Sequence, residues 1–308
     1  MSADGAPIEW LVDEPILNEP VLIVMLTGWI DAAGAAEAAA DALSAGCESS
    51  PIARFDDDTF IDFRARRPTM EVREGLNSNL RWSTIEFRAG RSPGGRDVLF
   101  LLGPEPDMAW NRFAATVTDV VVEVGVTHMI GMGAYPFATP HTRPSRLACT
   151  TPSADVLATV PHQRASVDVP AGIAALLEHS LHGRKIPAMT LWAQVPHYLS
   201  TMGYPAASLA LLEGVAQATG ISIDTTTLHN ESTIQHRRIE GMIADNAEHR
   251  AMLQQLEELY DAADEADAAA AGDAGPGGPG GPTDPSALEL RSGDELAAEI
   301  QRFLRDQD

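Results

Sequence analysis

Lysine is nearly absent from this 308-residue chain, because its 21 basic residues include a single lysine, Lys185, and are otherwise arginines. Lys185 lies in the run Gly-Arg-Lys-Ile-Pro, which is not the Gly-Lys-Ser/Thr ending of a phosphate-binding Walker loop. An enzyme that forms a Schiff base also needs a desolvated lysine. The composition therefore argues against both kinds of lysine-dependent chemistry.

Cysteine is also scarce. The two cysteines, Cys47 and Cys149, are far apart in the chain, and no Cys-x-x-Cys pair occurs. This spacing gives neither a disulfide framework nor a zinc ribbon, and it fits a reducing compartment. A nucleophilic thiol needs a neighbouring histidine or helix end, and nothing in the sequence places one at Cys149. We therefore predict no metal site, no cofactor and no catalytic cysteine.

Long hydrophobic runs and positive charge are missing as well. The longest early apolar run, residues 21–26, is far too short to span a bilayer, and the first residues lack the basic and apolar regions of a signal peptide. The formal net charge is −23, and such a surface repels nucleic-acid backbones and anionic lipids. We expect a cytoplasmic protein that binds neither nucleic acid nor membrane.

The chain does contain a regular alternation of apolar runs and helical segments. The run at 20–26 predicts a central strand buried on both faces, and the alanine-rich segment 32–43 predicts a helix packed on the sheet. The alternation predicts an α/β fold, a three-layer α/β/α sandwich with a mainly parallel sheet. Further strands are predicted at 52–63, 82–87, 98–102, 126–130, 166–169, 186–194 and 221–224, and further helices at 110–124, 171–179 and 205–219.

The pattern changes towards the end of the chain, and it divides the chain into four parts. We expect an α/β core domain over 1–225, followed by a helical extension over 226–263 made of one long helix or two. Residues 264–285 are rich in Ala, Gly, Pro and Asp, cannot bury apolar area and predict a flexible linker. A capping box at 292–295 and an apolar stripe predict a terminal amphipathic helix within 286–308, docked on the core or on a partner.

One segment combines a stiff backbone with reactive side chains. Residues 131–144 contain two glycines and three prolines and follow the strand predicted at 126–130. Because open α/β sheets bind ligands beyond the carboxyl ends of their strands, we predict a rigid loop here that holds the candidate site. His141 offers an imidazole, Thr142 a hydroxyl, and Arg143 a cation for carboxylate or phosphate. The alternative is structural, with Arg143 paired to an acidic residue and His141 capping a turn.

Two further segments are expected at the same edge of the sheet. Residues 196–198 follow another predicted strand, and residues 28–31 follow the central strand and open a helix whose amide groups can bind an anion. Asp31 is explained more simply as the N-cap of that helix. The candidate ligand or partner site therefore comprises Gly28, Trp29, Asp31, His141, Thr142, Arg143, His197 and Tyr198.

Two acidic groupings are explained better by structure than by chemistry. Asp56, Asp58 and Asp62 alternate with phenylalanines, as in a partly exposed strand that neighbouring arginines neutralise. Alternatively, such carboxylates do acid–base work or bind a divalent ion. His236 and Glu240 lie four residues apart in a predicted helix, but one His with one Glu is a far weaker signal than a metal motif. A solvated helix face explains this pair.

Four segments form a set that points to a family: 28–33 (Gly-Trp-Ile-Asp-Ala-Ala), 55–68, 140–144 (Pro-His-Thr-Arg-Pro) and 195–198 (Val-Pro-His-Tyr). Together they resemble the proteasome assembly chaperone family, in its actinobacterial branch. The resemblance extends over about residues 8–260 and reappears in the last helix. It implies an α/β/α sandwich similar to the nucleoside phosphorylase and hydrolase type, with a carboxyl-terminal helical extension.

The resemblance also implies a function without a settled enzymatic activity. Members of the family hold protein partners, so we expect a non-catalytic interaction protein whose partner is another protein or a second copy of the chain, that is, a homo-oligomer. Archaeal and eukaryotic relatives often engage the proteasome through a terminal hydrophobic-Tyr-any tripeptide. This chain ends Asp306-Gln307-Asp308, so docking in that mode is not expected. The alternative is a phosphorylase- or hydrolase-like enzyme for a small anionic or nucleoside substrate, with Arg143 as the anion clamp and His141 or His197 as the acid–base group.

Overall fold

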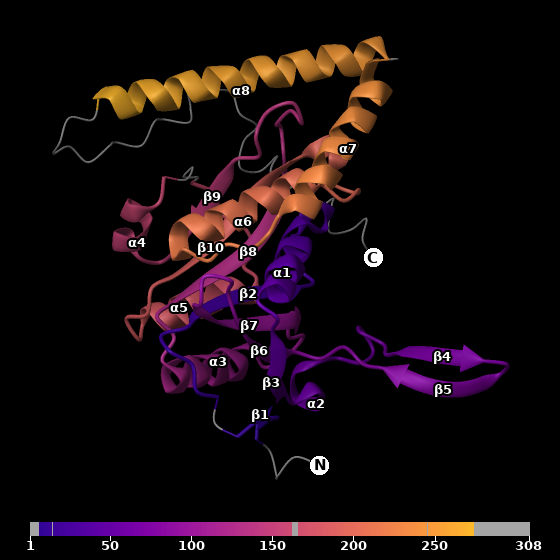
Figure 1. Ribbon diagram of the computed structural model, residues 1–308, viewed down its shortest axis with the longest axis vertical. Helices are drawn as coiled ribbons and strands as arrows, with labels where there is room; N and C mark the ends of the chain where they lie inside the picture. The colour runs from indigo at the N-terminus through magenta and orange to yellow at the C-terminus, as the bar shows by residue number, and fades with distance from the viewer. Residues whose placement is uncertain (1–5, 14, 162–165, 245, 274–308) are drawn as a thin grey trace.

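The structure is a computed structural model that describes residues 6–13, 15–161, 166–244 and 246–273 (Figure 1). Its centre is an eight-stranded sheet in the order β1-β3-β6-β7-β2-β8-β10-β9. The strands of this sheet are β1 (Ile8–Trp10), β2 (Val21–Thr27), β3 (Ser50–Phe55), β6 (Glu86–Arg91), β7 (Asp97–Pro104), β8 (His128–Phe137), β9 (Leu147–Thr150) and β10 (Ala188–Pro196).

The four central strands of the sheet, β7, β2, β8 and β10, run parallel to one another. Outside them β6 pairs antiparallel with β7, and β9 pairs antiparallel with β10. The central strand β2 carries Val21, Leu22 and Ile23, all with no exposed surface. A strand that is apolar on both faces needs cover on both faces, and this need fixes the layered architecture.

Helices provide that cover on each side of the sheet. Helices α1 (Ala35–Gly46) and α6 (Pro205–Thr219) pack together on one face, while α3 (Trp110–Val124) and α5 (Ile173–His182) pack together on the other (Figure 1). Shorter elements are α2 (Asp57–Phe60), α4 (Ala154–Thr159) and the 3₁₀ turns η1 (Ala32–Gly34) and η2 (His197–Leu199). The predicted three-layer α/β/α fold is confirmed.

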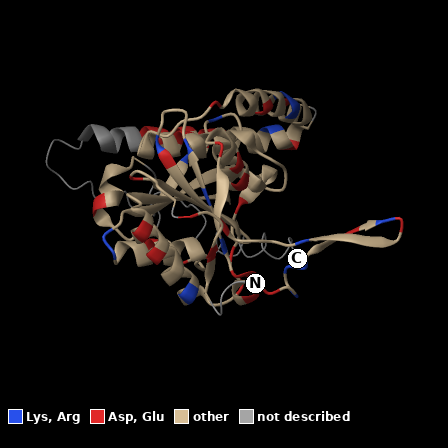
Figure 2. Ribbon diagram, turned by 60° about the horizontal axis from the view of Figure 1, so that its bottom comes forward, with Lys and Arg blue, Asp and Glu red and all other residues tan. Residues whose placement is uncertain are grey.

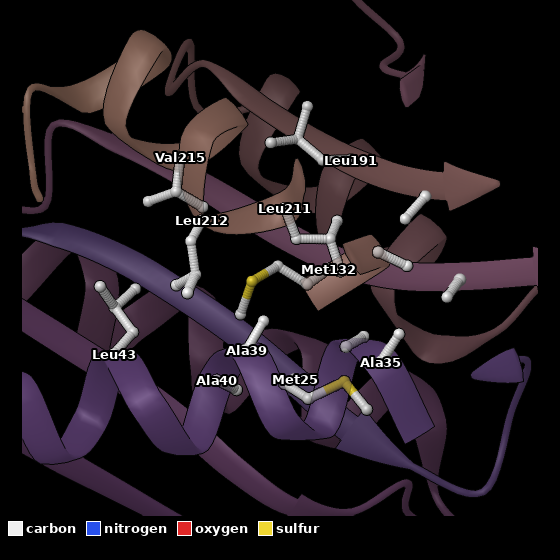
Figure 3. Close-up of a cluster of buried hydrophobic side chains, with 14 of the residues drawn as sticks. Met25, Ala35, Ala39, Ala40, Leu43, Met132, Leu191, Leu211, Leu212 and Val215 are labelled. Atoms are coloured by element: carbon white, nitrogen blue, oxygen red, sulfur yellow. The ribbon is translucent and has the colours of Figure 1, made fainter. Parts of the chain in front are cut away.

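Alanine sets how closely α1 approaches its neighbours. Ala39 and Ala40 of α1 are buried against a cluster that includes Met132 of β8 and Leu211 and Leu212 of α6 (Figure 3). Small side chains let the α1 backbone come near both the sheet and α6, and α1 and α6 are in direct contact. The prediction that the alanine-rich segment packs on the sheet is confirmed, although its helix starts three residues later than predicted, after η1.

The prediction of a rigid loop over residues 131–144 is wrong in its first half, because strand β8 continues to Phe137. The two glycines serve close packing between strands. A Cβ added at Gly131 would lie 2.5 Å from the Thr190 hydroxyl, and one at Gly133 would lie 2.3 Å from the Trp192 ring on the neighbouring strand. The loop itself starts only at Ala138.

Other strand predictions are corrected in the same way. The strand predicted at 52–63 ends at Phe55, because the acidic run after it forms α2. The strand predicted at 82–87 lies instead at Glu86–Arg91. Residues 166–169 and 221–224 form no strand. Among the described residues neither short run has a neighbouring strand to pair with, and a sequence pattern does not reveal whether such a partner is present.

The carboxyl-terminal extension is two helices, α7 (Thr226–Ala244) and α8 (Ala247–Asp273). The Asn246 side chain accepts the Glu248 and His249 amides at 2.9 and 3.3 Å and so starts α8. Helix α8 runs ten residues past the predicted end of the extension. The remainder of the predicted linker and the predicted terminal helix lie outside the described residues. Within the described part of the chain, no helix is long and apolar enough to cross a bilayer.

A second, two-stranded sheet was not predicted at all. Strands β4 (Thr69–Arg73) and β5 (Leu76–Arg81) form a hairpin closed by Glu74 and Gly75, both at positive φ. Figures 1 and 2 show this hairpin, hereafter the arm, projecting far from the body of the molecule.

Candidate functional site

Parallel strands bring the predicted site segments to one edge of the sheet. Strands β2, β8 and β10 end at Thr27, Phe137 and Pro196, so the segments 28–31, 138–144 and 197–198 all begin at the carboxyl edge. Asp31 forms an isolated bridge with Ala134 of β8, which ties the first segment to this edge.

His141 and Tyr198 meet there, as the sequence predicts. The Tyr198 hydroxyl accepts the His141 backbone amide at 2.9 Å and lies 2.8 Å from His141 Nδ1. His141 is only 4% exposed. Burial, and then the nearby His236 ring, lower the pKa of His141 to about 4, while burial raises the pKa of Tyr198 to about 12. Both side chains are therefore neutral at pH 7.

The far side of the His141 ring faces an open hollow of about 360 Å³. Its buried Nε2 has no hydrogen-bond partner in the structure. His236 of α7 lies across the hollow, with its ring centroid 5.2 Å from that of His141, and its Nε2 is 3.3 Å from the Glu240 carboxylate. The other lining residues are Tyr204, Ala206, Ser232, Thr233, Gln235, Arg237 and Ile239. The hollow can therefore accept a small polar group, with the free Nε2 of His141 among its lining atoms.

Thr142 and Arg143 face the opposite way, towards α8. The Arg143 guanidinium donates from Nε and Nη2 to the two carboxylate oxygens of Asp261, both at 2.8 Å, and its Nη1 lies 3.4 Å from Glu257. The Thr142 hydroxyl donates to the same Glu257 carboxylate. The Asp261 carboxylate holds the pKa of Arg143 above its usual range, and Arg143 in turn lowers the pKa of Asp261. Arg143 is therefore a structural ion-pair partner.

Arg146 completes this attachment. It is 14% exposed, donates to the Tyr260 carbonyl at 2.9 Å and to the Asp264 carboxylate, and stacks 3.7 Å over the Tyr260 ring. The Tyr260 hydroxyl donates to the Pro144 carbonyl at 3.1 Å. Residues 138–146, hereafter the clamped loop, are thus fixed to one face of α8 by hydrogen bonds from four side chains, those of Thr142, Arg143, Arg146 and Tyr260, and by a cation–π contact.

These contacts occupy the anion clamp that the enzyme alternative needs. The predicted anion clamp, Arg143, already binds two carboxylates. Cys149 is buried, and burial raises its pKa to about 11, so the thiolate is not populated at neutral pH. The described residues contain no group of three His, Cys, Asp or Glu side chains placed to hold a metal ion.

Gly28, Trp29 and Asp31 lie at the same edge but do not join the His141 cluster through any described contact. Asp31 accepts the Ala36 and Glu37 amides at 2.8 and 2.9 Å, so it caps α1, as its structural interpretation predicts. A Cβ at Gly28, which has φ +113°, would lie 2.6 Å from the Arg66 guanidinium.

Trp29 and His197 are placed by their immediate neighbours. The Trp29 ring lies against Gly172, where a Cβ would come within 2.7 Å of it. The His197 ring lies 5.3 Å from the Tyr198 ring, centroid to centroid, and its Nδ1 is buried with no hydrogen-bond partner. The single predicted site is therefore two neighbouring regions, with Gly28 and Trp29 in one and His141, His197 and Tyr198 in the other.

Sequence reasoning missed the residues that α7 and α8 contribute. His236 and Glu240 are more than a solvated helix face, because they line the hollow beside His141. Glu257, Asp261 and Asp264 recur at helical spacing and so share one face of α8. That spacing is a signal for an acidic stripe, but only the fold shows that the stripe meets two arginines more than a hundred residues earlier.

Comparison with known proteins identifies the family. The sequence profile of the PAC2 family matches residues 25–243. This chain belongs to the PAC2 family. No curated protein is significantly similar in sequence. Among solved structures, a proteasome-assembly chaperone homologue from Mycobacterium tuberculosis is 31% identical, with a TM-score of 0.71, and the match covers 77% of this chain and 99% of that one.

Two further structures have the same fold over a similar length. A Mycobacterium tuberculosis protein of unknown function is 29% identical, with a TM-score of 0.78 over 86% of this chain and 94% of that one. A PAC2 family protein from Streptomyces avermitilis is 28% identical, with a TM-score of 0.69 over 76% and 99%. The predicted resemblance to the actinobacterial branch of this family is confirmed.

Proposed function

We propose that this PAC2 family member is a non-catalytic protein-interaction protein that acts as an assembly chaperone and holds protein partners. The observation that carries the proposal is the match to the Mycobacterium tuberculosis proteasome-assembly chaperone homologue, which extends over nearly the whole of that protein. The family match starts within the central strand β2 and extends through the rest of the α/β/α core to Ile243 of α7. A shared chaperone activity is therefore supported at the level of the whole core.

The contacts of Arg143 and His141 at the carboxyl edge of the sheet support the same proposal. The carboxylates of α8 bind the Arg143 guanidinium. The His141 side chain is neutral, and the Tyr198 hydroxyl holds the His141 amide in place. A general acid–base group works best with a pKa near the operating pH, and a pKa of about 4 is far from it. A loop whose arginines are engaged by α8 offers a shaped, stable surface, which suits a protein that binds other proteins.

The partners that we propose to test are proteasome α-type and β-type subunits. Unassembled subunits from the same organism are mixed with the purified chain, and complexes are resolved by native mass spectrometry, with the assembled core particle as the control. The proposal predicts binding to unassembled subunits, faster formation of assembled particles, and release of the chain from the finished particle. If no subunit binds and the assembly rate is unchanged, the proteasome is not its partner.

A separate experiment tests the alternative that the protein is an enzyme. Phosphate, nucleosides and nucleotides are added separately and the thermal unfolding of the chain is followed. A ligand at 100 times its Kd stabilises by about 2.7 kcal/mol, which is easily detected. The proposal predicts no such stabilisation, whereas a clear stabilisation by any of these ligands would favour the enzyme.

A further inference from the structure

His141 holds a hydrogen-bond donor beside the hollow that the fold does not use. The Tyr198 hydroxyl oxygen accepts the His141 backbone amide and lies 2.8 Å from His141 Nδ1, and the described residues give this hydroxyl no other partner. Its own hydrogen is therefore donated to Nδ1. A neutral imidazole that accepts at Nδ1 carries its hydrogen at Nε2. The free ring nitrogen of His141 is thus an N–H group.

This N–H group lacks an acceptor within the part of the chain that the structure describes. The Nε2 atom is buried, and the whole residue is only 4% exposed. A buried donor without a partner costs free energy, so a native fold that keeps one does so for a reason such as ligand binding. An oxygen atom entering the hollow would supply the missing acceptor.

A cation lines the same hollow. Arg237 of α7 is exposed and makes no ion pair or hydrogen bond with any of the described residues. By contrast, the one carboxylate in the lining, that of Glu240, already contacts His236 Nε2 at 3.3 Å. Two unused groups, the His141 Nε2–H and the Arg237 guanidinium, therefore donate hydrogen bonds, and one of them carries a positive charge.

We propose that this hollow binds an organic carboxylate, which accepts a hydrogen bond from His141 Nε2 and is neutralised by Arg237. Arginine and carboxylate form strong, charge-assisted hydrogen bonds. The nearby Glu240 carboxylate repels a second negative charge, so a singly charged carboxylate is favoured over phosphate. The Ala206 and Ile239 side chains in the lining give the carbon chain behind the carboxylate an apolar wall.

The His236 side chain controls access to this donor. Its ring centroid lies 5.2 Å from that of His141, close enough to cover the Nε2 atom. The side chain is 40% exposed, and its contact with Glu240 is an exposed ion pair of the kind that contributes little to stability. His236 can therefore turn towards solvent when a carboxylate enters.

A carboxylate of this kind has two sources that share the same chemistry, the carboxyl end of a bound protein chain and a free small acid. The inference does not depend on the proposed function. If acetate fails to bind while proteasome subunits bind, only the carboxylate site is lost. If acetate binds and no subunit does, the site stands without that function.

Nuclear magnetic resonance of the chain labelled with isotopic nitrogen in histidine tests the donor first. The ring-nitrogen shifts of a neutral histidine report which nitrogen carries the hydrogen. The His141 signal is the one of nine histidine signals that the His141→Gln variant lacks. We expect the hydrogen on Nε2 in the free protein. A hydrogen on Nδ1 would make Nε2 an acceptor and would overturn the proposal.

Titration with sodium acetate, against sodium chloride at equal ionic strength, tests the ligand. Acetate is expected to shift the His141 Nε2 signal saturably, and Arg237→Gln is expected to weaken binding by about fivefold or more, because it removes the charge-assisted contact. Arg238→Gln is the matched control, since the neighbouring arginine is exposed but does not line the hollow, and its affinity should be nearly unchanged. No saturable shift, or equal losses in the two variants, would overturn the proposal.

A peptide and phosphate complete the test. A short alanine peptide with a free carboxyl end is expected to bind, whereas the same peptide with an amidated end and inorganic phosphate are not. Binding of the free peptide more tightly than acetate identifies a protein chain end as the source, and equal binding identifies a free small acid. Equal binding of the free and amidated peptides, or tighter binding of phosphate than of acetate, would show that the hollow does not recognise a carboxylate.

Discussion

The clamped loop and the arm both carry arginines in an acidic protein, yet they differ in how those arginines are used. Arg146 of the clamped loop is 14% exposed and contacts a carbonyl, a carboxylate and an aromatic ring. Arg81 of the arm is 67% exposed and binds one carboxylate. Exposed ion pairs contribute little to stability, whereas a shielded cation with several partners is costly to remove. The comparison separates a region that stabilises the molecule from one that is free to bind.

The largest effect is expected at Arg146. Arg146→Ala removes a charge-assisted hydrogen bond to the Tyr260 carbonyl, the Asp264 ion pair and the ring contact, so we expect a loss of about 2 to 4 kcal/mol. Thermal and denaturant unfolding measure it, and hydrogen exchange in α8 should rise most. Arg81→Ala on the arm is the matched control. A loss at Arg146 no greater than that control would show that the clamped loop is not held through α8.

Features set by local residues were predicted correctly from the sequence, whereas features set by distant contacts were missed. Helices α3 and α6 match their predicted bounds, because Pro205 starts α6 and because Gly125 and Gly220 follow the two helices at positive φ. These signals are local. The continuation of β8 past Gly131 was missed because the reason for that glycine, the neighbouring Thr190, lies on another strand.

The candidate site was predictable only where topology decides it. Parallel strands carry His141 and Tyr198 to one edge, and the sequence shows both strands. The attachment of Arg143 to Asp261 spans 118 residues and involves a helix whose orientation no local pattern fixes. The arm was missed because its strands bury nothing in the body, although Met70 and Val72 alternate with charged residues before a glycine turn.

A second test concerns the pH dependence of the clamped loop. The pKa of His141 is lowered to about 4 in the fold, against about 6.5 for an unperturbed histidine, so the unfolded chain binds more protons between these values. Stability from His141 is therefore complete above about pH 6.5 and is lost as the pH falls towards 4.

The variant His141→Gln isolates this contribution. The difference in unfolding free energy between wild type and variant should grow by at most about 3 kcal/mol from pH 4 to 6.5. Comparing the two proteins at each pH cancels Glu178, whose pKa is raised to about 7 by burial and which acts in the opposite direction. A difference that does not change with pH would mean that His141 titrates normally in the fold.

A smaller effect is expected at Tyr198. Tyr198→Phe keeps the ring but removes the hydroxyl that accepts the His141 amide and contacts Nδ1. A buried amide without a partner costs about 1 to 2 kcal/mol. Denaturant unfolding measures this loss, and amide exchange at His141 locates it. Tyr204→Phe is a control in a neighbouring buried tyrosine that does not contact the His141 amide. An unchanged exchange rate at His141 would place the anchor of the loop elsewhere.

The smallest effect is expected at the tip of the arm, where Leu76 is 72% exposed next to the turn at Glu74 and Gly75. Leu76→Ser removes an apolar group that packs on nothing in the body, so the unfolding free energy should change by no more than about 0.5 kcal/mol. The measurement is made at concentrations low enough for the monomer, since association would add its own stabilisation. A loss of 2 kcal/mol or more would show that the arm helps to hold the body together, and the contrast with the clamped loop would then fail.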